Sequence, residues 1–325
     1  MAGNMPNTTL SLKRLADHLG RSPQDARSLR KLLGHPSGQL KLAVRHAPFS
    51  VMTHNMGLLV SPAPYLGTDR DGAIAEIVGR IRALTPDVVG LCEVFADGER
   101  TRITNALSDL YPYYSEGPDE SLSFRSDGGL LLLSRHPTVA SNKMIFGPCD
   151  GWDCFALKGV IYIRVQPVSW PTPIDIFYSH TQDIETENGV NTLYYQLYGM
   201  TRFIETLWEP AIPKIIMGDL NIPGENPQHY DRLLRTLDWP RDCWTLAGNQ
   251  ADSGHTLVRE NNFYEDPDDR PSSNHRLDYV LMQAGTRLVP ILADIEILKF
   301  QHNGRFISDH FGVRASFDKI AIINI

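Results

Sequence analysis

The 325-residue chain has no run of about 18 apolar residues, so its sequence predicts no transmembrane helix. It also lacks a surplus of basic residues. The net charge of -7 argues against broad, salt-driven binding to nucleic acid, although basic residues gathered on one face would still allow it. Cysteine is scarce, and the four that occur show neither CxxC spacing nor histidine partners at zinc spacing, which disfavours a structural zinc site.

The amino-terminal segment lacks the apolar core of a secretory signal, so we expect a cytoplasmic protein, with peripheral contact at membranes allowed. Cys149 and Cys154, in the segment CDGWDC, could form a bridge if oxidised. Because disulfides are rare in the cytoplasm, reduced thiols are the expectation here.

The chain divides into two regions. Residues 1–46 hold two short amphipathic patterns, SLKRLADHLG and DARSLRKLLG, which predict a basic helical extension. The pair has a weak likeness to a helix-turn-helix, but a helical cap or a partner-docking arm is favoured. Residues 47–325 alternate strands with helices, which is typical of one α/β domain.

Apolar periodicity predicts the elements of this second region. The strands are expected over residues 49–55, 87–94, 128–134, 159–165, 174–180, 214–219, 276–282, 295–300 and 311–317. The helices are expected over residues 71–86, 102–110, 190–208 and 230–237. The polar stretch from 240 to 275 has little periodicity, and irregular segments of that length are often functional.

Polar side chains stand at the ends or edges of six of these strands. They are Asn55, Glu93, His180, Asp219 with Asn221, Asp278, and the pair Asp309 and His310. Strand ends converge on one rim in layered α/β domains, and ligands bind there. We therefore expect these side chains to form one site.

The residue types indicate the chemistry of this site. Carboxylates and amides without thiolates are ligands for Mg²⁺, Mn²⁺ or Ca²⁺. A cation would also relieve the mutual repulsion of clustered acids. Two imidazoles could donate to a phosphoryl oxygen or relay protons near neutral pH. A metal ion, an imidazole and an activated water together describe hydrolysis of a phosphate ester.

Each residue also has an ordinary structural interpretation when it is taken alone. These are an Asx-turn at Asp219, a helix cap at Glu93, an interior imidazole at His180, an exposed ion pair of Asp278 with Arg276, and a simple turn at Asp309 and His310. Their joint occurrence, in order along the chain at strand ends, favours a site.

The segments THNMG, GLCEVF, YSHTQ, GDLNIPG, HRLDYVL and SDHFGV, within residues 53–313, resemble the endonuclease/exonuclease/phosphatase superfamily. The resemblance implies the DNase I-like fold, a four-layer sandwich of two β-sheets between helices. It implies that Glu93, with Asn55 and Asp309, holds Mg²⁺, for which Mn²⁺ or Co²⁺ could substitute. It also implies that His310 is the general base or the imidazole that contacts the transition state, and that Asp278 orients it. Asp219 and Asn221 would position water and a phosphoryl oxygen, and His180 would contact phosphate.

The segment DCFALKGVIYIRV resembles neutral sphingomyelinases and bacterial sphingomyelinase C, in which a Lys-Gly pair precedes a strand. This resemblance implies that Lys158 binds a phosphate oxygen, although a lysine that only flanks a strand remains an alternative. It also implies a phosphodiesterase that cleaves sphingomyelin to ceramide and phosphocholine, with a phospholipid as partner. The turn at Trp170 and Pro171 is a candidate membrane anchor, although an ordinary exposed hairpin is favoured.

Three other functions remain open at this point. They are a nuclease, an inositol or sugar phosphatase on the same fold, and a non-catalytic scaffold. The acidic balance disfavours a nuclease, which would use a basic surface beside the site, and the basic amino-terminal arm is the one feature that favours it. A scaffold would be expected to lack a ligand or a histidine, and all of them are present.

Overall fold

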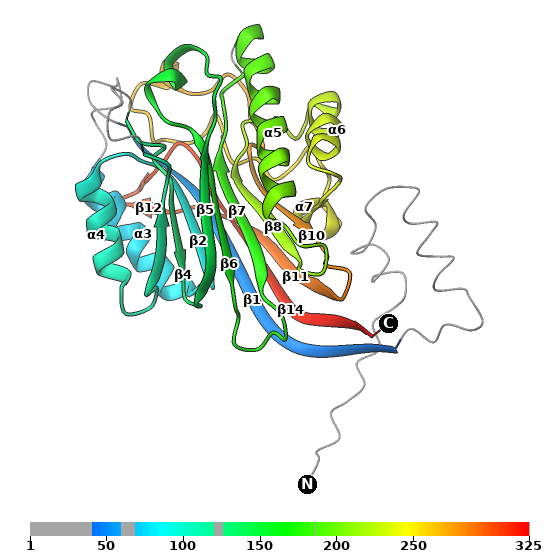
Figure 1. The fold of residues 1–325 in the computed structure, drawn as a ribbon. Coiled ribbons are helices and arrows are strands. Elements are labelled where there is room, and N and C mark those ends of the chain that lie inside the picture. The colour runs from blue at the N-terminus through cyan, green and yellow to red at the C-terminus, as the bar shows by residue number, and fades with distance from the viewer. Residues whose placement is uncertain (1–40, 60–68, 120–125, 185, 325) are drawn as a thin grey trace.

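The computed structural model describes residues 41–59, 69–119, 126–184 and 186–324, which form a four-layer sandwich (Figure 1). Two six-stranded mixed sheets pack face to face, and helices cover their outer faces. This arrangement confirms the expected DNase I-like sandwich.

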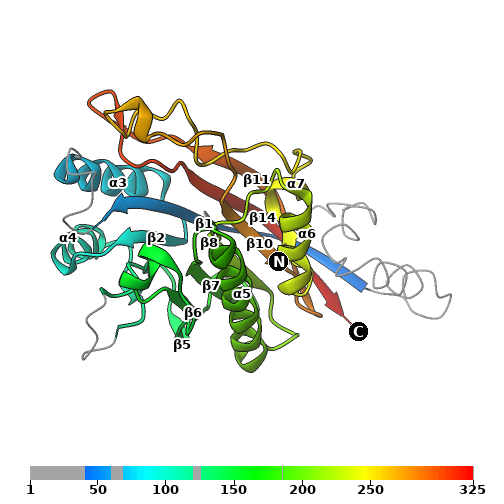
Figure 2. The ribbon, with the colours of Figure 1, turned by 90° about the horizontal axis from the view of Figure 1, so that it is seen from above.

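The first sheet has the strand order β11-β14-β1-β2-β4-β3. Its strands, in that order, are Leu288–Leu298, Gly312–Asn324, Lys41–Leu58, Val88–Val94, Leu131–Ser134 and Tyr113–Glu116. Helices α3 (Arg70–Leu84) and α4 (Asp97–Leu107) cover its outer face, and the short strands β12 (Gln301–His302) and β13 (Arg305–Phe306) form a separate hairpin. Figure 2 shows the two helices together on one side of the sandwich.

The second sheet has the strand order β5-β6-β7-β8-β10-β9. Its strands, in that order, are Thr138–Ile145, Gly159–Val165, Ile174–His180, Lys214–Asp219, Asp278–Gln283 and Arg241–Asp242. Helices α5 (Glu187–Leu207) and α6 (Pro227–Thr236) cover it, and α7 (Cys243–Leu246) follows β9. Two single turns of 3₁₀ helix, η1 (Gly151–Phe155) and η2 (Pro267–Asp269), lie in the connections.

Apolar side chains fill three interfaces, one between the sheets and one beneath each helical layer. Strands β7 and β8 are buried along their whole length, which explains why both read as nearly continuous apolar runs. Gly218 in β8 has a φ of +136°, and a Cβ there would lie 1.9 Å from the carbonyl oxygen of Ser179. Only glycine allows the two parallel strands to approach in this way.

Several elements extend beyond the expected bounds or were not expected. Strand β1 begins at Lys41 and pairs with β14, so residues 41–46 belong to the sheet rather than to the amino-terminal extension. The two helices expected near residues 11–34 lie outside the described residues. Strands β3 and β5 were missed because they are mostly exposed edge strands, which lack an apolar pattern. Strand β11 tolerates Pro290 because it too is an edge strand.

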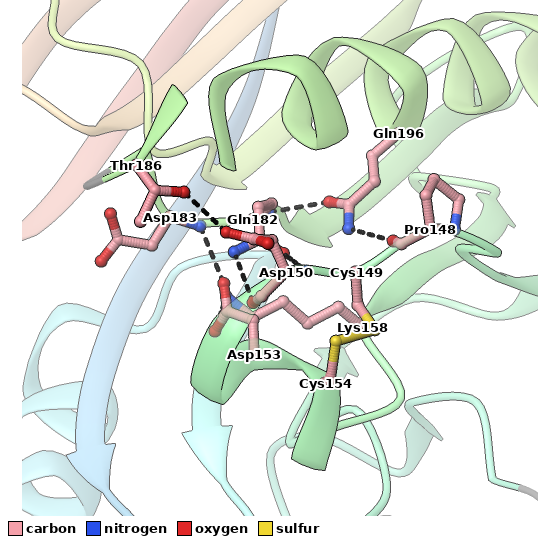
Figure 3. Close-up of a disulfide and its surroundings, with 10 residues drawn as sticks. All are labelled: Pro148, Cys149, Asp150, Asp153, Cys154, Lys158, Gln182, Asp183, Thr186 and Gln196. Carbon is pink, nitrogen blue, oxygen red and sulfur yellow. Dashed lines mark hydrogen bonds and ion pairs between the residues drawn. A yellow bond between two sulfur atoms is a disulfide. The ribbon is translucent and has the colours of Figure 1, made fainter. Parts of the chain in front are cut away.

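One alternative considered for a side chain is excluded, and one prediction is wrong. Trp170 is no membrane anchor, because it is buried against Phe49 and its indole N–H donates to the carbonyl of Ala47 at 3.2 Å. Cys149 and Cys154 are joined by a disulfide rather than reduced, because the turn η1 brings their Cα atoms to 5.1 Å (Figure 3). Within the described residues, no helix combines the length and the apolar character that a bilayer crossing requires.

Candidate functional site

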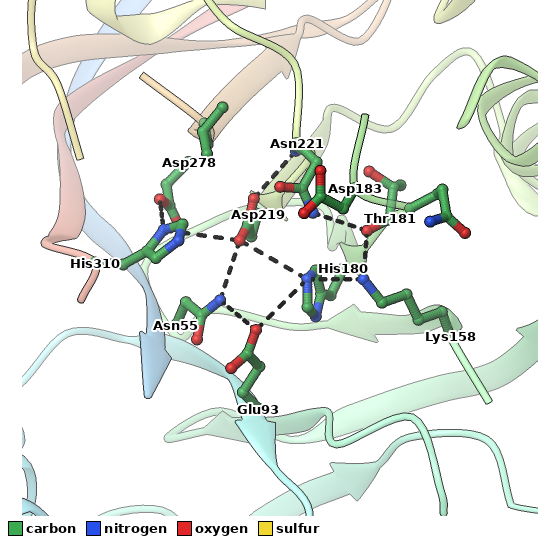
Figure 4. A network of polar contacts seen from close by, with 12 residues as sticks. Asn55, Glu93, Lys158, His180, Thr181, Asp183, Asp219, Asn221, Asp278 and His310 are labelled. Carbon is green, nitrogen blue, oxygen red and sulfur yellow. Dashed lines mark hydrogen bonds and ion pairs between the residues drawn. The ribbon is translucent and has the colours of Figure 1, made fainter. Parts of the chain in front are cut away.

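The two sheets deliver the expected polar side chains to one end of the sandwich (Figure 4). The first sheet contributes Asn55 from β1 and Glu93 from β2, which run parallel. In the second sheet β7 and β8 are also parallel, and their last residues, His180 and Asp219, are paired in register. Strand β10 runs the opposite way and begins there, so Asp278 lies opposite Asp219.

Asp219 both forms an Asx-turn and contributes a carboxylate oxygen to the site. Its Oδ1 accepts a hydrogen bond from the backbone N–H of Asn221 at 3.1 Å, which is the Asx-turn interpretation. Its Oδ2 faces the site, 3.1 Å from Asn55 Nδ2, 3.7 Å from His310 Nδ1 and 3.8 Å from His180 Nε2. Leu220 is fully buried in the outer core, so the strand end turns one carboxylate oxygen toward the ligand side.

Asp278 and His310 form a buried pair. His310 Nδ1 lies 2.8 Å from Asp278 Oδ2, and because an ionised carboxylate only accepts, Nδ1 carries the proton and Nε2 is left for another group. The alternative of an exposed Asp278–Arg276 pair is wrong, since Arg276 is buried and its Nη1 lies 3.0 Å from Asp242 Oδ2. Burial lowers the pKa of His310, but the charges of Asp278 and Asp219 outweigh it and raise that pKa well above its usual value.

His180, the second histidine, lies beside the positive charge of Lys158. Lys158 Nζ lies 3.1 Å from His180 Nε2, donates to the carbonyl of Thr181 at 2.8 Å and lies 2.8 Å from Asp153 Oδ1. Burial, with the positive charge of Lys158 and then of His310, lowers the pKa of His180 well below its usual value. His180 Nδ1 is buried without a hydrogen-bond partner, so His180 is not the satisfied interior imidazole of the structural alternative.

Asn221 and Glu93 have left-handed backbones, with φ of 49° and 55°. Such conformations cost free energy in residues other than glycine and cluster at functional sites. Asn221 donates through Nδ2 to the carbonyl of Thr181 at 2.9 Å, which links it to the Lys158 side of the site. Glu93 does not cap helix α4, because the N-cap there is Ala96, without a side-chain hydrogen bond.

The carboxylate of Glu93 lies beside Asn55 and His180 (Figure 4). Its Oε1 accepts from Asn55 Nδ2 at 2.9 Å and lies 3.9 Å from His180 Nε2. Burial and the negative charge of Asp309 raise the pKa of Glu93 to about 7. The Oδ1 of Asn55 accepts from the Gly57 N–H and its Nδ2 faces the two carboxylates, and the expected role of Asn55 as a metal ligand stays a prediction.

Asp309 is held by residues of the long irregular stretch. Its Oδ2 accepts from the hydroxyl of Tyr264 at 2.5 Å, and the side chain of Asn261 donates to its backbone carbonyl at 2.8 Å. Neither residue was singled out from the sequence, although the stretch from 240 to 275 was expected to be functional. Thr181, Gln182 and Asp153 were also not named as site residues, although the motif YSHTQ contains the first two and the segment DCFALKGVIYIRV begins with the third.

The donor set fits a divalent cation. Ligand atoms of Asp219, Asp278 and His310 all lie within 4.8 Å of one another. Asp278 Oδ1 is buried without a hydrogen-bond partner, and burial raises the pKa of Asp219 to about 6, with the charge of His310 opposing the rise and that of Asp278 adding to it. A cation beside Glu93 and Asp219 would add to the positive charge of His310 and Lys158 and would favour the deprotonated carboxylates. Oxygen donors without thiolates suit a hard cation.

Curated relatives resemble this chain over much of its length. Sphingomyelinase C 2 of Leptospira interrogans is 27% identical over 214 residues, which cover 60% of this chain and 34% of that protein. Sphingomyelinase C of Bacillus cereus is 24% identical over 257 residues, 71% of this chain and 74% of that protein. The chain therefore spans about a third of the Leptospira protein and about three-quarters of the Bacillus protein.

Solved structures share the fold. Sphingomyelinase C of Streptomyces griseocarneus superposes with a TM-score of 0.64 at 21% identity, over 83% of this chain and 99% of that one. A Staphylococcus aureus beta toxin mutant with bound magnesium ions also gives 0.64, at 17% identity over 83% and 99%. D. rerio TDP2 with a single-strand DNA product gives 0.64, at 16% identity over 83% and 98%. Residues 52–310 match the Endonuclease/Exonuclease/phosphatase family, and the chain belongs to that family.

Proposed function

We propose that this chain is a Mg²⁺-dependent phosphodiesterase that hydrolyses a phospholipid, most specifically sphingomyelin, to ceramide and phosphocholine. The observation that carries the proposal is the site itself. Four carboxylates, those of Glu93, Asp219, Asp278 and Asp309, and two imidazoles with opposite pKa shifts meet at one rim of the sandwich, where a phosphodiester could bind. The curated relatives, which are named sphingomyelinases, support the choice of a phospholipid.

Asp219 and His310 would act on the attacking water. Asp219 Oδ2 faces the site, and its raised pKa, about 6, suits a group that accepts a proton from water near neutral pH. The water oxygen forms a bond to phosphorus while the bond to the alcohol oxygen breaks, and the alkoxide takes a proton from solvent. His310, held through Nδ1 by Asp278, presents Nε2 as a donor to a phosphoryl oxygen.

Lys158, His180 and Asn221 would hold the non-bridging oxygens on the other side of phosphorus. Lys158 Nζ and His180 Nε2 are in direct contact at 3.1 Å, so a phosphoryl oxygen that approaches the pair from the site would lie close to a charged donor and an imidazole together. The Asn221 amide is tied to the same Thr181 carbonyl as Lys158. This shared anchor fixes the spacing of the amide and the ammonium before substrate binds.

The cation is proposed to be Mg²⁺, with Mn²⁺ or Co²⁺ as substitutes, because the donors are oxygens and hard. Glu93, with Asp309 beside it, would hold the ion, and Asn55 would steady Glu93 through its amide. When bound, the ion would offset the charge that develops on the phosphoryl oxygens and the alkoxide.

The disulfide bears on the compartment in which the protein acts. A disulfide such as Cys149–Cys154 persists in oxidising compartments and is rare in the cytoplasm. We therefore propose that the chain acts at the surface of a membrane in an oxidising compartment, rather than in the cytoplasm as first expected.

Direct assay tests the function. Sphingomyelin, a lysophospholipid, an inositol phosphate and plasmid DNA would each be incubated with the protein, with Mg²⁺ and with EDTA. We expect hydrolysis of sphingomyelin with Mg²⁺ and none with EDTA or with Glu93→Gln. Cleavage of DNA alone would replace the proposal with a nuclease. Hydrolysis of none of the four, despite measurable metal binding, would indicate a non-catalytic scaffold.

A further inference from the structure

Two aromatic side chains project together from the turn η1. The exposed fractions of Trp152 and Phe155 are 87% and 64%, and their ring centroids lie 5.6 Å apart. Among the exposed aromatic side chains of the described residues, these two are the ones without a phenol hydroxyl. Neighbouring apolar rings that are exposed to water often mark a surface that binds another molecule or a membrane.

The turn that carries the rings is joined to the catalytic rim (Figure 3). Asp153 Oδ1 lies 2.8 Å from Lys158 Nζ, and its Oδ2 accepts from the backbone N–H of Asp183 at 2.8 Å. The backbone N–H of Asp150 donates to Gln182 Oε1 at 2.8 Å. Gln182 and Asp183 lie two and three residues after His180, so the turn that carries the ring pair is held beside the site.

We propose that Trp152 and Phe155 dock the protein on a zwitterionic lipid surface, such as one of phosphocholine headgroups. This inference rests on the proposed phospholipase function. Indole and phenyl rings favour the water–lipid interface of a bilayer. The turn lies next to the residues proposed to bind the headgroup phosphate. A protein docked through the two rings would therefore hold its site close to the lipid headgroups.

Charge selects the kind of lipid. The segment from 148 to 157 contains Asp150 and Asp153 but no lysine or arginine, and the whole chain has a net charge of -7. Docking on anionic lipid depends on basic residues close to the membrane, which this turn lacks. An acidic turn with two aromatic rings therefore fits a neutral, choline-bearing surface.

Other exposed or aromatic groups are poorer candidates. Val168, 90% exposed, lies in the β6–β7 turn, which is the end of β7 opposite to His180. In the β12–β13 region, Phe300 is buried, and the ring of Phe306 packs 4.9 Å from that of Phe311. Val168 is thus a matched control, because it is exposed and apolar but remote from the site.

Vesicle sedimentation tests the proposal. Wild-type protein, the double variant Trp152→Ala/Phe155→Ala and the control Val168→Ala would be mixed with phosphatidylcholine vesicles in EDTA. We expect partitioning of the double variant to be weaker by roughly tenfold or more, and that of Val168→Ala to equal wild type. We also expect phosphatidylserine in the vesicles to weaken binding. Equal binding of the double variant, or stronger binding to phosphatidylserine, would overturn the proposal.

The assay in EDTA separates this inference from the proposed activity, because binding needs no turnover. A protein that binds vesicles through the ring pair but hydrolyses nothing would refute only the activity. A second copy of the chain is the rival occupant of the rings. If light scattering shows a wild-type dimer that the double variant loses, while vesicle binding is the same for both, the surface is a self-association face and the lipid proposal fails.

Discussion

The two histidines of the site stand in opposite electrostatic surroundings. His310 lies between Asp278 and Asp219, whose charges raise its pKa despite burial, whereas His180 lies beside Lys158 and has its pKa lowered by burial and that charge. We call the first the acidic half of the site and the second the basic half. One residue type is thereby held as a cation on one side of the substrate position and as a neutral ring on the other.

This difference indicates a division of labour. A protonated His310 can donate to an oxygen that gains negative charge, and the adjacent Asp219 can accept a proton from water. In the basic half the positive charge resides on Lys158, and His180 shares it through the contact at 3.1 Å. This division predicts in which half a substitution should reduce turnover more. It also predicts in which direction a substitution should shift the pKa of each histidine.

The largest effect is expected in the acidic half. His310→Ala removes the group proposed to contact the reacting oxygens, and such groups contribute about 10²- to 10⁴-fold to turnover. Asp278→Asn should also reduce kcat, because a neutral amide no longer stabilises the imidazolium, and it should lower the pKa of His310. Steady-state kinetics and NMR titration of the ring measure the two effects. Near-native turnover of His310→Ala would remove His310 from the mechanism.

A smaller loss is expected in the basic half. Lys158→Met keeps the length of the side chain and removes its charge, so binding of the phosphate should weaken and kcat should fall about 10²-fold, as for the loss of one oxyanion donor. The pKa of His180 should rise, opposite to the change that Asp278→Asn makes at His310. A fall in the His180 pKa in Lys158→Met would contradict the electrostatic contrast between the halves.

The strands that carry both halves were largely predictable from sequence. Strands β6, β7 and β8 have the bounds expected from their apolar runs, because full burial leaves a continuous signal. The ends of these strands then predicted His180 and Asp219. Tyr264 and Asn261 could not be found in this way, because they reach Asp309 from an irregular loop with no periodicity. Burial of Trp170 depends on Phe49, more than 100 residues earlier, and no local pattern reports such a contact.

Metal binding should act mainly through the carboxylates, and its effect should depend on pH. The pKa of Glu93 is raised from 4.5 to about 7 and that of Asp219 from 3.8 to about 6, chiefly by burial. A raised carboxyl pKa favours the protonated form in the fold, so the metal-free protein loses stability as pH rises from about 4 to about 7. A cation binds the deprotonated carboxylates and reverses this loss.

Thermal unfolding with Mg²⁺ and with EDTA measures that reversal. At a metal concentration 100 times the dissociation constant we expect stabilisation by about 2.7 kcal/mol at pH 7.5 and much less at pH 5. Glu93→Gln is the matched variant, because it keeps the size of the side chain and cannot ionise, and its metal response should be lost at both pH values. A metal-induced shift that is equal at pH 5 and pH 7.5 would show that these carboxylates do not bind the ion.

The smallest effect on turnover is expected from the disulfide that borders the basic half. Cys149→Ser/Cys154→Ser opens a bridge with a sequence separation of 5, which by loop-closure entropy costs about 2 kcal/mol of stability. Lys158 should nevertheless keep its place, because its contacts to Thr181 and Asp153 do not involve either sulfur. We therefore expect a lower Tm with a change in kcat of about threefold or less on a soluble substrate. If kcat instead fell as far as in Lys158→Met, the covalent bridge rather than the hydrogen bonds would be what positions the ammonium, and the basic half of the site would then respond to redox conditions while the acidic half would not.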